Sequence, residues 1–220
     1  MGHRPQTFAV IGLGTFGSII ATELMRFGNH VIGVDIDRKI ASDHAEDLSQ
    51  SLILDSKDEA ALREAGIGDC DAAIVAMASD LEASILTAMN LKLVGVPKVW
   101  AKALNRTHHR ILAKLGVDRV IHAEEEIGRS IAQILHNPYI RDYAALGNGF
   151  HVVNFTVPES LEGRRPRDMD VLARFEVRPI GVMRGTDWLG ASECDAPLQV
   201  DDRLILLGTR ANLRAFAETI

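Results

Sequence analysis

A glycine-rich turn, set between a short apolar run and a helical pattern, constrains the fold of this chain more than any other feature. The apolar run is Phe8–Ile11, and Gly12, Gly14 and Gly17 follow it in the spacing GxGxxG. A second apolar run ends at Asp35, roughly 20 positions after the turn. A strand, a glycine turn, a helix and a downstream acidic residue together are typical of a dinucleotide-binding unit. We therefore predict an adenine-nucleotide site near the start of the chain.

Each residue of this pattern has a physical role in holding a nucleotide. Gly12 permits the tight turn, Gly14 lets backbone N–H groups approach a pyrophosphate, and Gly17 lets the helix pack close to the sheet. The N-terminus of that helix adds a positive dipole end. We expect Asp35 to accept hydrogen bonds from ribose hydroxyls and to repel a 2′-phosphate, which disfavours NADP. The alternative is a set of glycine turns in an α/β fold that binds no nucleotide.

Composition and charge exclude several classes of protein. The chain has 220 residues, of which 47% are hydrophobic, enough for one large or two modest globular domains. Its net charge of −6 argues against a nucleic-acid partner, since such proteins show a basic face. No apolar stretch approaches the ~18 residues that span a bilayer, and no signal peptide is recognisable. Cys70 and Cys194 lie far apart, which is typical of a reducing compartment, so we expect a cytoplasmic protein.

The first half of the chain alternates between strand and helix patterns. Strands are predicted at Phe8–Ile11, Val31–Val34, Ser51–Leu54, Ala72–Ala76, Val99–Ala101 and Arg119–Ile121. Helices are predicted between them, at Thr15–Phe27, Arg38–Glu46, Lys57–Ala65, Leu81–Val94 and Arg106–Leu115. This alternation predicts the α/β class with a Rossmann-like, doubly wound parallel sheet over residues 1–123. Ligands bind such sheets outside the carboxyl ends of the strands.

The second half has a different character. Residues 124–146 are interpreted as a crossover helix with a linker. The helix either covers the edge of the first domain's sheet or packs on a second protomer. The glycines of Gly147–Gly149 mark a linker. Residues 147–220 then form a small α+β lobe, with strands at Phe150–Val157, Val177–Met183 and Arg203–Leu207 and helices at Asp168–Phe175 and Arg210–Thr219.

This second half lacks the side chains that a dehydrogenase needs. The chain has no His after His151, no Lys after Lys114 and no Tyr after Tyr143. A hydride-transferring enzyme requires an acid or a base beside its substrate. We therefore expect a protein that binds a nucleotide without chemistry. A small NAD-dependent oxidoreductase and a purely structural nucleotide-binding module are the alternatives.

Several polar residues have an ordinary structural explanation beside a functional one. A helix points the adjacent residues His108–His109 in different directions, so surface or helix-cap roles are expected instead of a metal pair. The carboxylates Glu124–Glu126 either complement a helix dipole or bind a divalent cation beside the phosphates. Asp55–Ser56 is either an N-capping pair or a neighbour of adenine.

Five segments of the chain carry a family resemblance. They are FAVIGLGTFG (8–17), VIGVDID (31–37), DAAIVAMASDLEAS (71–84), VWAKALNRTHHRILAKLGVDRVIHAEEEIG (99–128) and SIAQIL (130–135). Together they resemble the KtrA/TrkA family, the cytoplasmic regulatory subunits of bacterial potassium uptake systems, which are built from RCK domains. The fourth segment is the most discriminating. The C-terminal lobe resembles the family more weakly, through VPESLEG (157–163), GVMRG (181–185) and DDRLILLG (201–208).

The resemblance implies a regulator with no enzymatic activity. In that family the first domain binds ATP, ADP or NAD(H), and dimers assemble into an eight-membered ring. The ring lies at the inner face of the membrane and controls potassium flux through an integral-membrane pore subunit. The implied site residues are Gly12, Leu13, Gly14, Thr15, Phe16 and Gly17 at the phosphates, Asp35 at the ribose, Ile36, Asp55 and Ser56 at the adenine, Ala76, Met77 and Ala78 after the fourth strand, Lys102 after the fifth, and Glu124 as ligand of a cation.

The chain departs from the family pattern at one phosphate contact. Many relatives carry Arg where this chain has Thr15, and that Arg reaches towards the terminal phosphates. Thr15 donates a hydrogen bond but brings no charge, which makes NAD(H) or ADP more credible than ATP. In some relatives the C-terminal lobe binds a cyclic dinucleotide. Leu172 stands at the equivalent of a basic contact there, with Arg174 two residues on, so that activity stays open.

Overall fold

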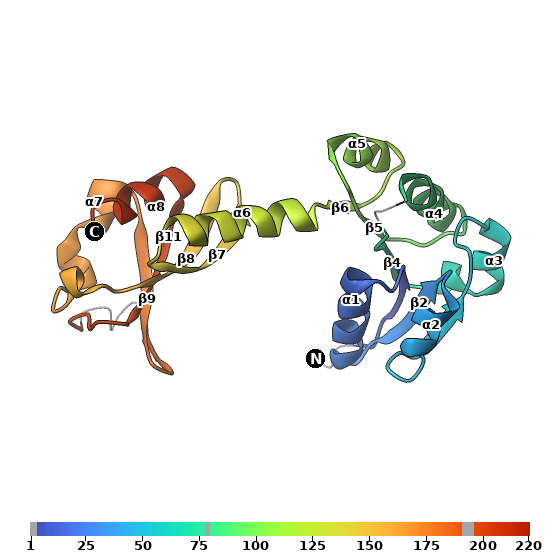
Figure 1. Cartoon of the computed structure of the whole chain (residues 1–220), viewed down its shortest axis with the longest axis horizontal. Helices are drawn as coiled ribbons and strands as arrows, with labels where there is room; N and C mark the ends of the chain where they lie inside the picture. Colours follow the sequence, from blue (N-terminus) through green and yellow to red (C-terminus); the bar gives the residue numbers. More distant parts are fainter. Residues whose placement is uncertain (1–3, 78–79, 191–195) are drawn as a thin grey trace. The chain divides into compact units, whose positions relative to one another are not determined.

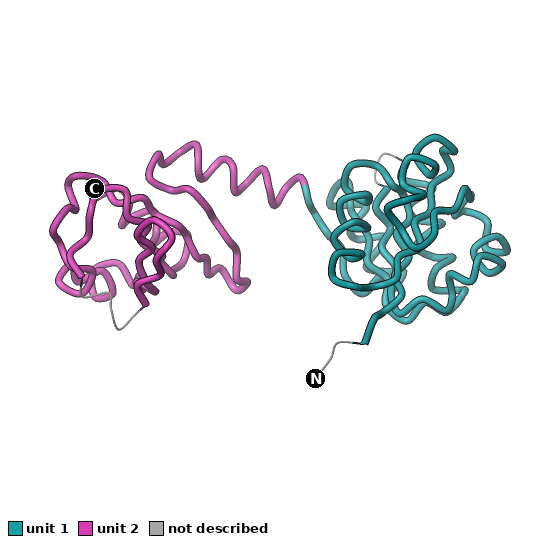
Figure 2. The backbone as a smooth tube through the Cα atoms, turned by 90° about the horizontal axis from the view of Figure 1, so that it is seen from below, with its two compact units in different colours: residues 1–123 teal, residues 124–220 magenta. Residues whose placement is uncertain are grey.

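The structure is a computed structural model that describes residues 4–77, 80–190 and 196–220. The chain forms two compact units, residues 1–123 and 124–220, drawn in teal and magenta in Figure 2. Each unit has its own sheet and its own hydrophobic core. Within the described ranges, every helix is too short or too polar to cross a membrane.

The first unit is a six-stranded parallel sheet covered by helices (Figure 1). Its strands are β1 (Thr7–Ile11), β2 (His30–Asp35), β3 (Gln50–Ile53), β4 (Ala72–Val75), β5 (Val99–Lys102) and β6 (Arg119–Ile121), in the spatial order β3-β2-β1-β4-β5-β6. Its helices are α1 (Thr15–Arg26), α2 (Arg38–Asp43), α3 (Glu59–Glu64), α4 (Leu81–Leu93) and α5 (Arg106–Lys114), with a 3-10 turn at Ile67–Asp69. The strand order reverses between β1 and β4, so the predicted doubly wound fold is confirmed.

Apolar side chains on both faces of β1 explain why helices cover both faces of the sheet. Successive residues of a strand point to opposite faces. Ile11 therefore packs in one core with Leu91 of α4 and Leu112 of α5, whereas Val10 packs in the other with Ala21 of α1. Burial of each large side chain contributes about 1.5–3 kcal/mol. A continuous apolar run such as this is typical of a central parallel strand.

The ends of the helices follow from capping residues. Asp37, Asp58, Asp80 and Asn105 precede α2, α3, α4 and α5, and each side chain accepts a hydrogen bond from a backbone N–H of the first turn. Helix α1 differs, because it begins after Gly14 without a side-chain cap. The first N–H groups of α1 thus keep their capacity to bind an anion.

The second unit is an antiparallel sheet with helices. It contains α6 (Ala123–His136), β7 (Ile140–Gly147), β8 (Phe150–Thr156), α7 (Val171–Phe175), β9 (Arg178–Arg184), β10 (Asp187–Leu189), β11 (Arg203–Thr209) and α8 (Arg210–Ala217), with 3-10 turns at Glu159–Leu161 and Pro166–Met169. The sheet order is β10-β9-β11-β8-β7, and every pair is antiparallel. Strands β7 and β10 are absent from the sequence prediction.

The predicted linker at Gly147–Gly149 is wrong. These residues form the turn between β7 and β8, and Gly147, Asn148 and Gly149 have φ values of +88°, +51° and +80°. Two glycines and an asparagine suit such left-handed backbone, which a hairpin turn requires. Residues 140–146, interpreted from the sequence as part of the crossover helix and linker, belong instead to edge strand β7.

Helix α6 exposes a row of apolar side chains. Ile134 packs against the core of the second unit. Ile127, Ile131 and Leu135 are exposed and lie four residues apart, so they form one stripe along the helix. Helix α6 therefore carries apolar surface beyond what the described residues of its own unit cover.

A buried ion pair holds the second unit together near the end of β9. The Asp202 carboxylate, 2% exposed at its side chain, accepts two hydrogen bonds from Arg184, at 2.9 and 2.7 Å, and a third from the Gln199 N–H at 2.8 Å. Arg184 also donates to the Pro197 carbonyl at 2.9 Å. The pair therefore ties β9 to the segment that precedes β11.

Arg184→Met should lower the free energy of unfolding of the second unit by about 3 kcal/mol, because it leaves the buried Asp202 charge without its cationic partner. Arg214→Met is the matched control, since it breaks an exposed pair with Glu218 and should cost under ~1 kcal/mol. In a Trp100→Phe background, Trp188 is the single tryptophan, and its fluorescence follows this unit in urea. Equal losses for the two variants would contradict the prediction.

His108 is buried, contrary to the surface or cap role expected from the sequence. It is fully covered, and its Nδ1 accepts a hydrogen bond from the Leu104 N–H at 3.2 Å. The Nε2 atom has no hydrogen-bond partner in the described part of the chain. Burial lowers the pKa of His108 below its ordinary value of 6.5. The folded protein therefore holds this ring neutral.

The stability of the first unit should fall as the pH drops below about 6.5. Unfolded His108 takes up a proton there that the folded protein excludes, so the stabilisation is present above that pH and lost below it. His108→Asn should flatten this part of the pH dependence, and His30→Asn, at an exposed position, should not. The free energy of unfolding is measured at each pH by urea titration, followed by Trp100 fluorescence in a Trp188→Phe background. Identical slopes for wild type and His108→Asn would refute the prediction.

Candidate nucleotide-binding site

The predicted site residues of the first unit lie at the carboxyl ends of five strands. Parallel strands bring these ends to one edge of the sheet. The glycine turn follows β1, and Ile36 follows β2, whose last residue is Asp35. Ala76 and Met77 follow β4, and Lys102 ends β5. Asp55 and Ser56 follow β3, so the fold places all of them on the edge where such sheets bind ligands.

Three glycines shape the turn for different reasons. Gly12 has φ +92°, and a Cβ there would lie 3.2 Å from the Met77 backbone nitrogen. A Cβ on Gly17 would lie 1.8 Å from the Gly12 carbonyl oxygen, so only glycine permits α1 to approach this closely. A Cβ on Gly14 would meet no described atom within 4 Å. Gly14 therefore faces open space, as a residue beside a bound phosphate must.

Asp35 is held in place before any ligand arrives. Its Oδ2 accepts a hydrogen bond from the Leu13 N–H at 2.8 Å, and its Oδ1 accepts one from the Asp37 N–H at 2.9 Å. Each carboxylate oxygen keeps a second acceptor position. The carboxylate is thus oriented for the two hydroxyls of a ribose, and its charge opposes a 2′-phosphate.

The adenine side of the site contains one exposed apolar residue and one occupied hydroxyl. Ile36 is 66% exposed, which is unusual for isoleucine and suits contact with a flat base. Asp55 accepts a hydrogen bond from the Lys57 N–H at 3.0 Å. Ser56 is buried, and its hydroxyl bonds to that of Thr87 at 2.6 Å. The Ser56 side chain is therefore committed to the protein, which leaves its backbone as the part that can line the adenine pocket.

Two polar residues of α4 support this side of the site and were missed in the sequence. Asn90 donates to the carbonyl oxygens of Ser56 and Lys57, at 3.2 and 2.8 Å, and Thr87 bonds to the Ser56 hydroxyl. Both are buried. The sequence does contain a signal for them. Ser84, Thr87 and Asn90 are polar residues spaced three apart along a largely apolar helix, so they share one face.

The phosphate side includes the cation of Lys102, and its helix begins with threonine. Thr15 is the exposed first residue of α1. The Nζ of Lys102 lies 5.2 Å from the centroid of the Phe16 ring, so β5 brings its charge to the glycine turn. The turn, the N-terminus of α1 and Lys102 fit the phosphates of an adenine nucleotide.

Two predicted residues stand apart from this group. Ala78 lies outside the described residues. Glu124 is in the first turn of α6 and belongs to the second unit, so its role at a cation stays a prediction. Among the described residues, no three His, Cys, Asp or Glu side chains gather as a metal site would require.

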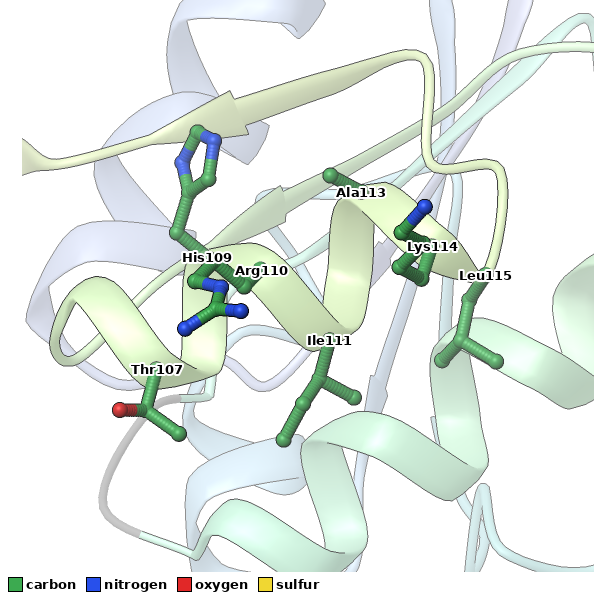
Figure 3. A pocket seen from close by; sticks show the side chains of 7 residues that line it. All are labelled: Thr107, His109, Arg110, Ile111, Ala113, Lys114 and Leu115. Carbon is green, nitrogen blue, oxygen red and sulfur yellow. The ribbon is translucent and has the colours of Figure 1, made fainter.

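A hollow of the first unit lies elsewhere, along α5. Its volume is about 710 Å³, and it is lined by Thr107, His109, Arg110, Ile111, Ala113, Lys114 and Leu115 (Figure 3). None of the predicted nucleotide ligands contributes to it. Figure 3 shows Thr107, Ile111 and Leu115 on one side of the helix. This open surface lacks glycine N–H donors, and we do not assign the nucleotide to it.

Comparison with known proteins gives one consistent family. The model of the TrkA-N domain matches residues 8–123. Ktr system potassium uptake protein A of Bacillus subtilis (strain 168) is 31% identical over 213 residues, which cover 97% of this chain and 96% of that protein. The protein of the same name from Vibrio alginolyticus is 31% identical over 206 residues, 94% of each chain.

A solved structure agrees on the fold. The GsuK channel bound to NAD matches with a TM-score of 0.67 and 14% identity, over 97% of this chain and 39% of that one. At this identity the likeness shows the fold alone. The named relatives are potassium uptake proteins and not dehydrogenases, in agreement with the predicted family and the predicted lack of enzymatic activity. The chain therefore belongs to the TrkA-N domain family, together with the Ktr system potassium uptake proteins.

Proposed function

We propose that this chain is a nucleotide-sensing regulatory subunit that controls potassium flux through a membrane pore subunit from the cytoplasmic side. The observation that carries the proposal is a preformed site, in which Asp35 is oriented by two backbone N–H donors beside an open glycine turn. A prearranged site binds its ligand without a further ordering cost. The relatives named as Ktr potassium uptake proteins support the role in transport.

The ligand we propose is an adenine nucleotide, NAD(H) or ADP in preference to ATP. Thr15 offers a neutral hydrogen bond, and a neutral contact distinguishes a third phosphate poorly. Lys102 supplies charge for a diphosphate. The GsuK channel, which shares the fold, has been solved with NAD. Glu124, in the first turn of α6, is the residue we propose as the ligand of a divalent cation.

We further propose that the chain works as a ring of dimers. Leu93 on α4 and Leu104 just before α5 are 56% and 58% exposed, and the two helices are neighbours on one face of the sheet. The stripe Ile127, Ile131 and Leu135 on α6 is a second exposed apolar surface. Exposed apolar surface of this kind is typical of protein–protein contacts. Two distinct surfaces suit a dimer contact and a contact between dimers.

Asp35→Asn should weaken NADH binding at least about tenfold, because a charge-assisted hydrogen bond to the ribose is lost. Asp37→Asn is the control, since asparagine preserves the N-cap of α2 and the carboxylate at 35 is untouched. Calorimetric titration with NADH, ADP, ATP and NADPH measures the effect. A wild-type preference for NADPH, or steady consumption of NADH, would contradict the proposal.

Potassium uptake tests the transport role directly. Cells that lack this protein should take up potassium more slowly, and wild type and Asp37→Asn should restore the rate. Asp35→Asn should restore it only in part, because the regulator assembles but senses its nucleotide poorly. Unchanged uptake in the deletion strain would refute the transport role without affecting the nucleotide site.

Leu93→Glu combined with Leu104→Glu should lower the oligomeric state by one step, from ring to dimer, because two charges then face an apolar contact. Ile19→Glu, an equally exposed apolar position on α1, should leave the mass unchanged. Analytical ultracentrifugation of each variant gives the mass. A monomeric wild type would rule out the ring.

A further inference from the structure

A polar cluster lies where β7, β8 and α8 of the second unit meet. It consists of Tyr143 on β7, His151 on β8 and Arg210, the first residue of α8. The ring centroids of Tyr143 and His151 are 4.6 Å apart. The Arg210 guanidinium lies 5.9 Å from the Tyr143 centroid, and its Nε is 3.3 Å from the Tyr143 hydroxyl. Three residues that are distant in the sequence thus form one connected group.

His151 is buried with hydrogen-bonding capacity to spare. It is 8% exposed, and its Nδ1 has no hydrogen-bond partner in the part of the chain that the structure describes. Burial first, and then the charge of Arg210, lower the pKa of His151, while the Gly149 backbone opposes them. The ring is therefore neutral at pH 7, with one donor and one acceptor nitrogen. A buried polar atom without a partner is rare in native proteins and calls for an explanation.

Arg210 brings a charge that no described carboxylate balances. Arg214, one turn later on the same helix, pairs with Glu218 at 2.7 Å, whereas Arg210 has no carboxylate oxygen of the described residues within 4 Å. Arg210 also stands at the N-terminus of α8, where the first backbone N–H groups have no partner within the helix. The Thr209 hydroxyl caps this end by accepting from the Asn212 N–H, so the charge of the cluster is that of Arg210.

We infer that this cluster binds an oxyanion, the phosphate or carboxylate group of a small ligand, between Arg210 and Tyr143. The guanidinium presents planar N–H donors that match such a group. The Tyr143 oxygen accepts from Arg210, so its own proton is available to the ligand. The 3.3 Å contact between them is at the long end of the hydrogen-bond range, and an anion oxygen replaces it at small cost. The ring of His151 packs on that of Tyr143, and its unused Nδ1 accepts from a water held with the oxyanion.

Such a site makes the second unit responsive to a ligand of its own. A ligand at Arg210 links α8 to the β7–β8 hairpin, because the cluster takes one residue from each of these elements. The inference does not depend on the nucleotide site, which lies in the first unit, and it would survive the failure of that proposal.

Protection of Arg210 from phenylglyoxal tests the inference on the full chain. The rate of modification of Arg210 and of Arg214 is followed by mass spectrometry of peptides, with inorganic phosphate or acetate added at constant ionic strength in chloride. At ten times the dissociation constant the rate at Arg210 should fall about tenfold, and the rate at Arg214 should stay constant. Anions bound at the glycine turn of the first unit do not affect this readout. Protection by phosphate alone or by acetate alone identifies the ligand class.

Tyr143→Phe should weaken the protection of Arg210 about tenfold, because the oxyanion loses one donor. Tyr139→Phe is the matched control, since Tyr139 packs on Phe155 in the core. In this variant an anion should protect Arg210 as strongly as it does in the wild type. The inference is overturned if neither anion protects Arg210, if Arg214 is protected equally, or if Tyr143→Phe behaves as wild type.

Discussion

The close packing of α1 onto the turn after β1 is the constraint on which the first unit's site depends. Any side chain at Gly17 would collide with the Gly12 carbonyl, so glycine alone lets the helix begin at the edge of the sheet. The same turn directs the Leu13 N–H to the Asp35 carboxylate. Backbone donors for phosphate and a carboxylate for ribose are thus fixed relative to each other by main-chain geometry.

A weakly charged phosphate site is sufficient for a regulator that works as an oligomer. Inversion of a 1:99 equilibrium requires about 5.5 kcal/mol of differential binding. Shared among the eight subunits of the proposed ring, this is roughly 0.7 kcal/mol for each site, or about a threefold preference. A neutral hydrogen bond such as Thr15 offers is worth on the order of 1 kcal/mol. In the proposed ring, a neutral contact from Thr15 is therefore sufficient, although it distinguishes phosphates less strongly than a charged contact would.

The sequence predicts the first unit well and the second unit less well, for a physical reason. In the first unit, apolar strands buried on both faces alternate with helices, and local patterns decide each element. In the second unit, Gly147–Gly149 carries the same signal for a linker and for a hairpin turn. Only the pairing of Tyr143 with Val153 across β7 and β8 distinguishes the two, and a local pattern does not contain it. The short strand β10 was missed for the same reason, since it depends on its partner β9.

The same limit applies to polar residues, because their hydrogen-bond partners can be distant in the sequence and are known only from the structure. The place of Asp35 at the end of β2, beside the glycine turn, follows from local spacing along the chain. The Ser56 hydroxyl, in contrast, is occupied by Thr87, 31 residues away. His108 became a core residue because α5 turns it inward, away from the solvent that its polarity suggests. An unpartnered buried atom therefore has meaning only once the fold is known. At His151 such an atom lies beside Arg210 and Tyr143, which carry the inferred oxyanion site. At His108 burial alone accounts for the lowered pKa.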